Sequence, residues 1–110
     1  MPGNANKTNI IAGLFKAFAF ETITVDNTVK SLTAATYKVD SGGEKAKRAL
    51  ITCEDAQIRY LYTGGTPTAS VAHILNPMDV LVLTGSDNIS NFKCIRKGSV
   101  SGTLMITYEN

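Results

Sequence analysis

The sequence predicts an all-β protein: a single β-sandwich of about seven short strands with jelly-roll or Greek-key-like connections. From about Val25 onward, apolar runs of strand length recur roughly every 8–12 residues, with turn residues between them. No helical period extends over this span, and threonine, which suits strands, is abundant. At 110 residues the chain is long enough for one core. We expect residues 1–17 to form an N-terminal arm and residues 18–110 to form the sandwich.

The N-terminal region allows two interpretations. Apolar residues recur at helical spacing at five positions, Ile10, Ile11, Leu14, Phe15 and Phe18. Thr8 or Asn9 could cap a short helix there. Alternatively, FAFETITV is the first strand and the residues before it form an extended arm. The apolar positions are then expected to contact a neighbouring subunit, although packing on the chain's own sandwich fits the pattern equally well.

The remaining strands are separated by turns and loops, of which SGGEK is the most glycine-rich. DVLVLTG is apolar on both faces, which is typical of an interior strand. The last two segments are expected to pair through a turn over Gly98–Gly102. In order, the expected strands after the first are VKSL, TYKV, RALITCE, QIRYLYT, DVLVLTG, NFKCIRKG and GTLMITYE.

Charge and hydropathy argue against two classes of partner. Eleven basic and nine acidic residues leave a formal net charge of +2. Binding to nucleic acid by counterion release normally needs many Lys and Arg on one face, so we expect no nucleic-acid partner. No stretch approaches the ~18 apolar residues of a membrane-spanning helix. We therefore expect no membrane partner and synthesis in the cytoplasm.

The two cysteines, Cys53 and Cys94, each lie in a predicted strand, on its apolar face by alternation. Two buried free thiols are expected for a protein made in the cytoplasm. A disulfide would require the two strands to face each other closely. One histidine and two distant cysteines without CxxC spacing predict no metal site, and no motif predicts a cofactor.

The segment TGGTPTASVAHILNPMD carries the most varied side-chain chemistry. It lacks the GxxxxGK[ST] pattern of a phosphate-binding loop. His73 and Asp79 could orient a base, but catalysis would also need a nucleophile placed beside them. We therefore expect no enzyme and interpret the segment as a long surface connection. The residues expected to hold its geometry or to make contacts are Arg59, Gly64, Gly65, Pro67, His73 and Asp79.

Tyr60 and Tyr62 lie on one face of their predicted strand, alongside Ile58. Exposed tyrosine rings on one face could stack on a sugar. Packing in the core or at an interface is the alternative use of the same rings.

Three segments together cover roughly residues 23 to 109: ITVDNTVKSLTAATY, RALITCEDAQIRYLYTGGTPTASVAHILNPMDVLVLTG and ISNFKCIRKGSVSGTLMITYE. Their succession resembles a family of small virion proteins of tailed bacteriophages. In that family an LT..TY corner and an IRY strand precede G..PT...GH.L..GD.L.L, and FR.IR.G..S.TL.VTY ends the chain. Two departures affect turn geometry: Ala72 and Met78 stand where the pattern usually has glycine.

The resemblance implies a structural role in the virion, as a capsid decoration (cement) subunit or a small head or tail accessory protein. It implies the major capsid protein as a partner, and the N-terminal arm is the expected reach onto it. A small subunit on a symmetric lattice also suggests a homo-oligomer, with a trimer at a lattice three-fold axis as the natural arrangement. The alternative is a glycan-binding module of a head fibre or tail that uses Tyr60 and Tyr62, and a hydrolase is a more distant third.

Overall fold

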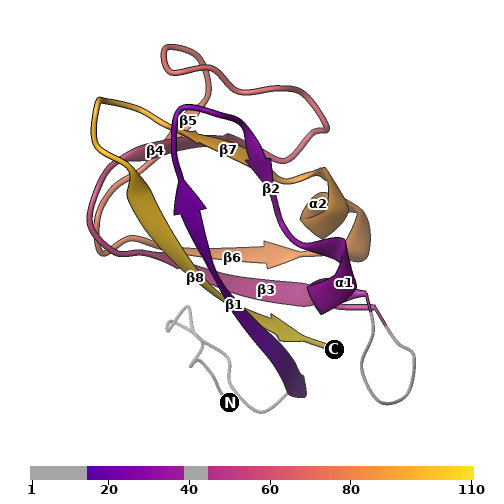
Figure 1. The fold of residues 1–110 in the computed structure, drawn as a ribbon. Helices are drawn as coiled ribbons and strands as arrows, with labels where there is room; N and C mark the ends of the chain where they lie inside the picture. Colours follow the sequence, from indigo (N-terminus) through magenta and orange to yellow (C-terminus); the bar gives the residue numbers. More distant parts are fainter. Residues whose placement is uncertain (1–14, 39–44) are drawn as a thin grey trace, which may run out of the picture.

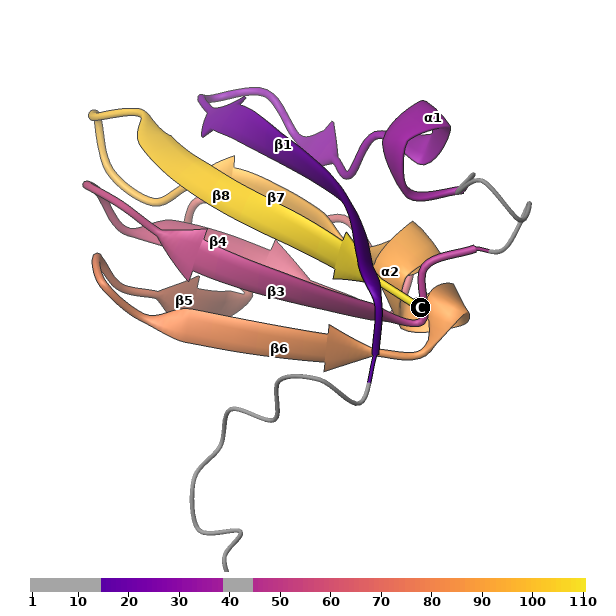
Figure 2. The same cartoon turned by 90° about the horizontal axis from the view of Figure 1, so that it is seen from below.

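The computed structural model describes residues 15–38 and 45–110, which form a sandwich of two four-stranded antiparallel sheets (Figure 1). Sheet A has the strand order β1-β8-β3-β6 and sheet B has the order β2-β7-β4-β5. In Figure 2 the strands of sheet A lie side by side in front of sheet B. The predicted all-β sandwich is confirmed.

Eight strands and two short helices make up the described part of the chain. Sheet A contains β1 (Ala17–Val25), β3 (Arg48–Cys53), β6 (Val80–Thr84) and β8 (Gly102–Glu109). Sheet B contains β2 (Lys30–Ser31), β4 (Ile58–Leu61), β5 (His73–Leu75) and β7 (Lys93–Arg96). The helices are α1 (Ala34–Tyr37) and α2 (Ser86–Asn91). Neither of these helices has the length and apolar character needed to span a membrane.

The N-terminal strand interpretation is the correct one for the described residues. Phe18 lies in β1, which begins at Ala17, and its side chain packs against the core. The helix interpretation is therefore wrong at Phe18, because the strand that contains it pairs with β8 from Ala17 to Val25, with a register shift between Ala17 and Ala19. Ile10, Ile11 and Leu14 lie outside the described residues, as does most of the SGGEK loop.

Two other predicted elements differ in the structure. Thr36 and Tyr37, predicted to lie in the strand TYKV, belong instead to α1, and Val39 lies outside the described residues. The Tyr37 ring is buried and lies 5.8 Å from the Tyr108 ring. The alanines favour the helix, and burying one aromatic ring fixes it in place. Ser86–Asn91 form a helix, α2, after the predicted strand DVLVLTG, and the short strand β5 lies within the predicted connection.

The last two strands do not pair with each other. β7 pairs with β2 and β4 in sheet B, whereas β8 pairs with β1 and β3 in sheet A. The connection that ends at Gly102 therefore crosses from one sheet to the other. A Cβ atom at Gly102 would lie 2.9 Å from Ile58 Cγ2 and 3.0 Å from the Ala56 carbonyl oxygen. Only glycine allows the chain to enter β8 so close to the β3–β4 connection.

β6 is an edge strand, so the predicted interior position of DVLVLTG is wrong for the isolated chain. Leu83 is buried and Leu81 packs against the core, but Val80 and Val82 point outward and remain 50% and 37% exposed. β6 thus has apolar residues on both faces although, among the described residues, it pairs with only one strand, β3.

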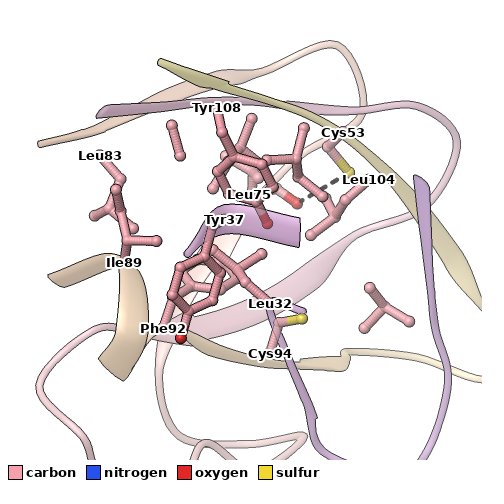
Figure 3. Close-up of a cluster of buried hydrophobic side chains, with 14 of the residues drawn as sticks. Leu32, Tyr37, Cys53, Leu75, Leu83, Ile89, Phe92, Cys94, Leu104 and Tyr108 are labelled. Atoms are coloured by element: carbon pink, nitrogen blue, oxygen red, sulfur yellow. Dashed lines mark hydrogen bonds between the residues drawn. The ribbon is translucent and has the colours of Figure 1, made fainter. Parts of the chain in front are cut away.

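The core fills the space between the sheets with the alternate residues of each strand (Figure 3). Ile89, in α2, and Phe92, the residue after this helix, are both fully buried and close one end of this core. Cys53 from sheet A and Cys94 from sheet B are both buried and free, which confirms the prediction of two buried thiols. Burial raises the pKa of the Cys94 thiol to about 12.

Candidate functional site: the outer face of sheet A

The outer face of sheet A is assembled by strand register. In β8, Leu104, Ile106 and Tyr108 point into the core, so the residues between them point outward. The register then aligns outward residues from all four strands into rows. The first row is Phe20, Thr107, Leu50 and Val82, and the second row is Thr22, Met105, Thr52 and Val80.

These two rows contain apolar and threonine side chains and no charged residue. Phe20 is 60% exposed, and Val80 and Val82 are open to solvent at the opposite edge. Within the rows, the Thr22 hydroxyl donates to the Met105 sulfur at 3.4 Å. Covering apolar groups with another protein is favourable, and a hydroxyl that keeps a hydrogen-bond partner costs far less to bury than a charge does. The face is therefore suited to contact with a protein surface.

At one end of this face, two opposite charges neutralise each other within the chain. Arg48 and Glu109 are directly opposite each other in the register and form an ion pair. The Arg48 guanidinium lies 4.4 Å from the centre of the Phe15 ring. Phe15, the first described residue, therefore lies on the outer side of sheet A and extends its apolar character.

The outer side of sheet B is different, because cations hold the β4–β5 connection there. Arg59 points outward from β4 and donates to the carbonyl oxygens of Ala69 at 2.9 Å and Ala72 at 2.7 Å. Lys93 on the neighbouring strand donates to the Gly64 carbonyl oxygen at 3.3 Å. This part of the predicted surface connection is thus bound to sheet B by two side chains.

Asp79 closes the turn that leads into β6. Its carboxylate accepts from the Asn76 N–H at 2.9 Å, and its own N–H donates to the Asn76 carbonyl at 3.0 Å. Pro77 precedes Met78, which has a φ of 74°. Proline followed by a positive φ is the geometry of a type II turn, in which the Met78 position favours glycine. His73 does not join this turn but lies beside the Tyr60 ring.

The predicted glycines and proline lie at the start of the same connection. Gly64 has a φ of 96°, which its lack of a Cβ permits. The Gly65 N–H donates to the Thr63 hydroxyl at 3.3 Å, and Pro67 is buried. They shape a tight loop after β4.

Tyr60 lies at the centre of an aromatic stack. Its ring is 5.7 Å from Phe92, 5.5 Å from His73 and 6.4 Å from Tyr62, with an angle of 17° between the two tyrosine planes. Burial raises the pKa of Tyr60, and the nearby Tyr62 and Asp79 raise it further. Tyr62 ends the stack and is 38% exposed.

A shallow depression of about 190 Å³ lies between the β3–β4 and β7–β8 connections. It is lined by Ala56, Gln57, Gly98, Ser99 and Val100. It is smaller than the roughly 300–1,000 Å³ of typical small-molecule sites. In residues 15–38 and 45–110, no three His, Cys, Asp or Glu side chains gather closely enough to hold a metal ion.

The fold and the outer face of sheet A together define a small all-β sandwich with an uncharged surface of apolar and threonine side chains. Comparison with known proteins gave no match to any family model, curated protein or solved structure. The residues of the two rows were not among the predicted site residues, whereas Phe15, which lies beside them, was. The signal was present in GTLMITYE, whose outward positions carry Thr, Met and Thr before the first charge.

Proposed function

We propose that this chain is a structural protein of a bacteriophage virion, a capsid decoration subunit that docks on the major capsid protein and stabilises the head lattice. The docking surface in this proposal is the outer face of sheet A, with its rows of Phe20, Leu50, Met105 and the β6 valines. The role is mechanical and requires no cofactor.

The observation that carries the proposal is a match between the family pattern and the backbone. The family pattern usually has glycine at two positions, where this chain has Ala72 and Met78. Among the described residues these are the two non-glycine residues with positive φ, at 156° and 74°. Positive φ is the conformation that glycine adopts at low cost. Positive φ at the two positions where the pattern has glycine is what we expect if this chain shares the turns of that family, and it supports the proposal.

The composition of the outer face supports the same role. A decoration subunit must cover a fixed patch of capsid surface in many identical copies. Two rows of apolar and threonine side chains provide such a patch without buried unpaired charges, which would weaken binding strongly. The ion pair between Arg48 and Glu109 lies at the border of the patch, where its side chains are only 11% and 14% exposed, so docking has little charge left to remove from water.

The test places a charge on this face and compares it with the same change elsewhere. Phe20→Asp alters an exposed side chain in the first row, and Val100→Asp alters one of similar exposure, 60% against 66%, in the β7–β8 connection. Both variants should fold, because neither side chain is in the core. Binding to particles assembled without this chain is measured by co-sedimentation.

We expect Phe20→Asp to weaken particle binding at least about tenfold, which corresponds to about 1.4 kcal/mol. Val100→Asp should bind like the unmodified chain. Equal binding by both variants would show that sheet A is not the docking face. An unmodified chain that does not bind particles would overturn the proposed function itself.

A second candidate function, glycan binding, is favoured by the aromatic stack alone. Tyr62 presents a ring that is partly exposed and nearly parallel to Tyr60, as a sugar-stacking platform requires. Because the chain has no tryptophan, a change in tyrosine fluorescence on titration with oligosaccharides would report binding at this stack. Loss of that change in Tyr62→Ala would assign the site, and no change with any sugar would remove this candidate.

A further inference from the structure

Among the described residues, no strand pairs with the outer edge of β6, and this edge lacks the usual protection against pairing. Its sequence, VLVLT, contains no charge and no proline, and its pairing with β3 shows no register shift. Natural edge strands are normally protected by short length, charges, prolines or bulges. β6 has five residues and none of the other devices.

The other sheet edges of the described chain are protected. In sheet B, β2 has two residues and β5 has three, which is too short for a stable additional ladder. In sheet A, the other edge strand is β1, which has an irregularity between Ala17 and Ala19. Its Glu21 carboxylate also accepts from the Thr33 N–H, which holds the residues before α1 against this strand.

The hydrogen bonds at the two ends of β6 show which of its backbone groups are unused. Gly85 N–H donates to the Lys47 carbonyl, and Cys53 N–H donates to the Asp79 carbonyl. Bonded and non-bonded pairs alternate along an antiparallel ladder. Leu81 and Leu83 are therefore bonded to β3, and the N–H and C=O groups of Val80, Val82 and Thr84 point away from it.

One of these outward groups already has a partner within the chain. The Asn88 side chain, in α2, donates to the Thr84 carbonyl oxygen at 2.9 Å. Within residues 15–38 and 45–110, the outward groups that have no partner at the middle of the edge are those of Val80 and Val82. They are two N–H donors and two C=O acceptors, two residues apart on one strand.

We propose that β6 pairs with β6 of a second copy of this chain, antiparallel across a two-fold axis at Leu81. In this register Val80 of each copy lies opposite Val82 of the other. Each pair exchanges two N–H···O=C bonds, so the four open groups of each copy are all satisfied. The two A sheets then form one continuous sheet of eight strands, within the size range of natural sheets.

The hydrogen-bonding pattern of β6 favours a second copy of this chain as its partner. The open groups of β6 complement an identical antiparallel strand, so the contact is the same from both sides, as a two-fold axis requires. The outward Val80 and Val82 side chains lie next to those of the partner and lose their exposure to water. DVLVLTG, apolar on both faces, becomes an interior strand in the pair, which is the position that its composition predicts.

The pair adds to the proposed function without depending on it. Two copies joined at β6 present the rows of both outer faces as one surface, twice as large as that of a single chain. The contact itself is centred on a five-residue strand, which is small for a specific interface. We therefore expect a pair that dissociates on dilution and that forms in the absence of particles.

The first test measures the mass of the purified full chain by sedimentation equilibrium over a range of concentrations. The proposal predicts 23.6 kDa, twice the 11.8 kDa of one chain, at high concentration. Val82→Lys places two lysines beside the two-fold axis and should raise the dissociation constant at least about tenfold. Val100→Lys, the matched control at an exposed valine outside sheet A, should leave it unchanged, and circular dichroism checks that both variants fold.

Three results would overturn the pair: a monomer at every concentration, a mass of three chains, or a dimer that Val82→Lys does not weaken. A dimer weakened by Val82→Lys supports it. The register has its own test, because opposite bonded residues have Cα atoms about 5.5 Å apart, within disulfide range. Mixing Val80→Cys with Val82→Cys should give more cross-linked dimer than either variant alone, and equal or smaller amounts would contradict the axis at Leu81.

Discussion

At the residue scale, the backbone of Met78 is strained by the turn in which it lies. Its positive φ follows from the type II turn that Asn76 and Asp79 close by hydrogen bonds. A non-glycine residue in the left-handed region costs roughly 1–2 kcal/mol. The strain is retained because the turn directs the chain into β6 and because Met78 N–H donates to the Cys53 carbonyl at 2.7 Å.

Met78→Gly should therefore stabilise the protein. The gain from relieving the positive φ is partly offset by the greater flexibility of glycine in the unfolded chain, so we expect a net increase of up to about 1 kcal/mol in the free energy of unfolding. Denaturant titration measures it. Val100→Gly, at an exposed residue without positive φ, is the control and should give no gain. A loss of stability in Met78→Gly would contradict the turn geometry.

Cys94 links a buried thiol to the pH dependence of stability. Burial raises its pKa in the folded chain from 9.0 to about 12. Below pH 9 the thiol is protonated in both the folded and the unfolded states, and its contribution to stability is complete. Between pH 9 and 12 the unfolded state loses the proton first, so the free energy of unfolding falls by at most about 1.4 kcal/mol per pH unit.

Replacing this thiol should flatten that part of the pH profile. Cys94→Val keeps an apolar side chain in the core and removes the ionisable group. Denaturant titrations of both proteins at several pH values between 9 and 12 should show a shallower decline for the variant. Parallel declines would mean that the Cys94 thiol has the same pKa in the folded and unfolded states, contrary to its burial.

At the scale of elements, the connection from β7 to β8 can be tested with two glycines. Gly102 enters β8 where a Cβ would meet the Ala56 carbonyl and the Ile58 side chain, and a Cβ at Gly98 would meet nothing within 4 Å. Gly102→Ala should lower the free energy of unfolding by about 1–3 kcal/mol, because a backbone carbonyl cannot move aside. Gly98→Ala should be neutral or slightly stabilising. Similar stabilities in thermal melts would argue against the sheet-to-sheet crossing.

This connection also shows what could be predicted from sequence and what could not. RALITCE and GTLMITYE were predictable strands, because each buries one face and alternates accordingly. The pairing of β7 with β8 was predicted wrongly, because a glycine-containing turn looks the same in a hairpin and in a crossing between sheets. The helix at Ala34–Tyr37 was missed because four residues are too few to show a helical period.

The candidate face illustrates the same limit for a site. Arg59 and Asp79, singled out for their chemistry, form local bonds in the connection before β6. The outer face instead depends on Phe20, Leu50 and Met105, which are far apart in sequence. They come together only through the register of β1, β8 and β3. Strand register depends on pairing partners, which the sequence alone did not specify.

At the scale of the whole molecule, the two sheets have different surroundings. Sheet B carries the β4–β5 connection, held by Arg59 and Lys93. Sheet A presents two uncharged rows of side chains and, among the described residues, the unpaired edge of β6. A particle subunit needs surfaces of this kind, one for the particle and one for its own copies. The two-fold pair differs from the trimer expected at a lattice three-fold axis, and the measured mass distinguishes 23.6 from 35.4 kDa, two or three chains of 11.8 kDa.

The most direct test of the proposed function is the copy number of this chain in purified virions, measured against the major capsid protein by quantitative mass spectrometry. A decoration subunit that docks on the head lattice should be present in a fixed ratio to the major capsid protein. Absence of the chain from purified particles, or a copy number matching only a tail or portal ring, would contradict a role as a capsid decoration subunit.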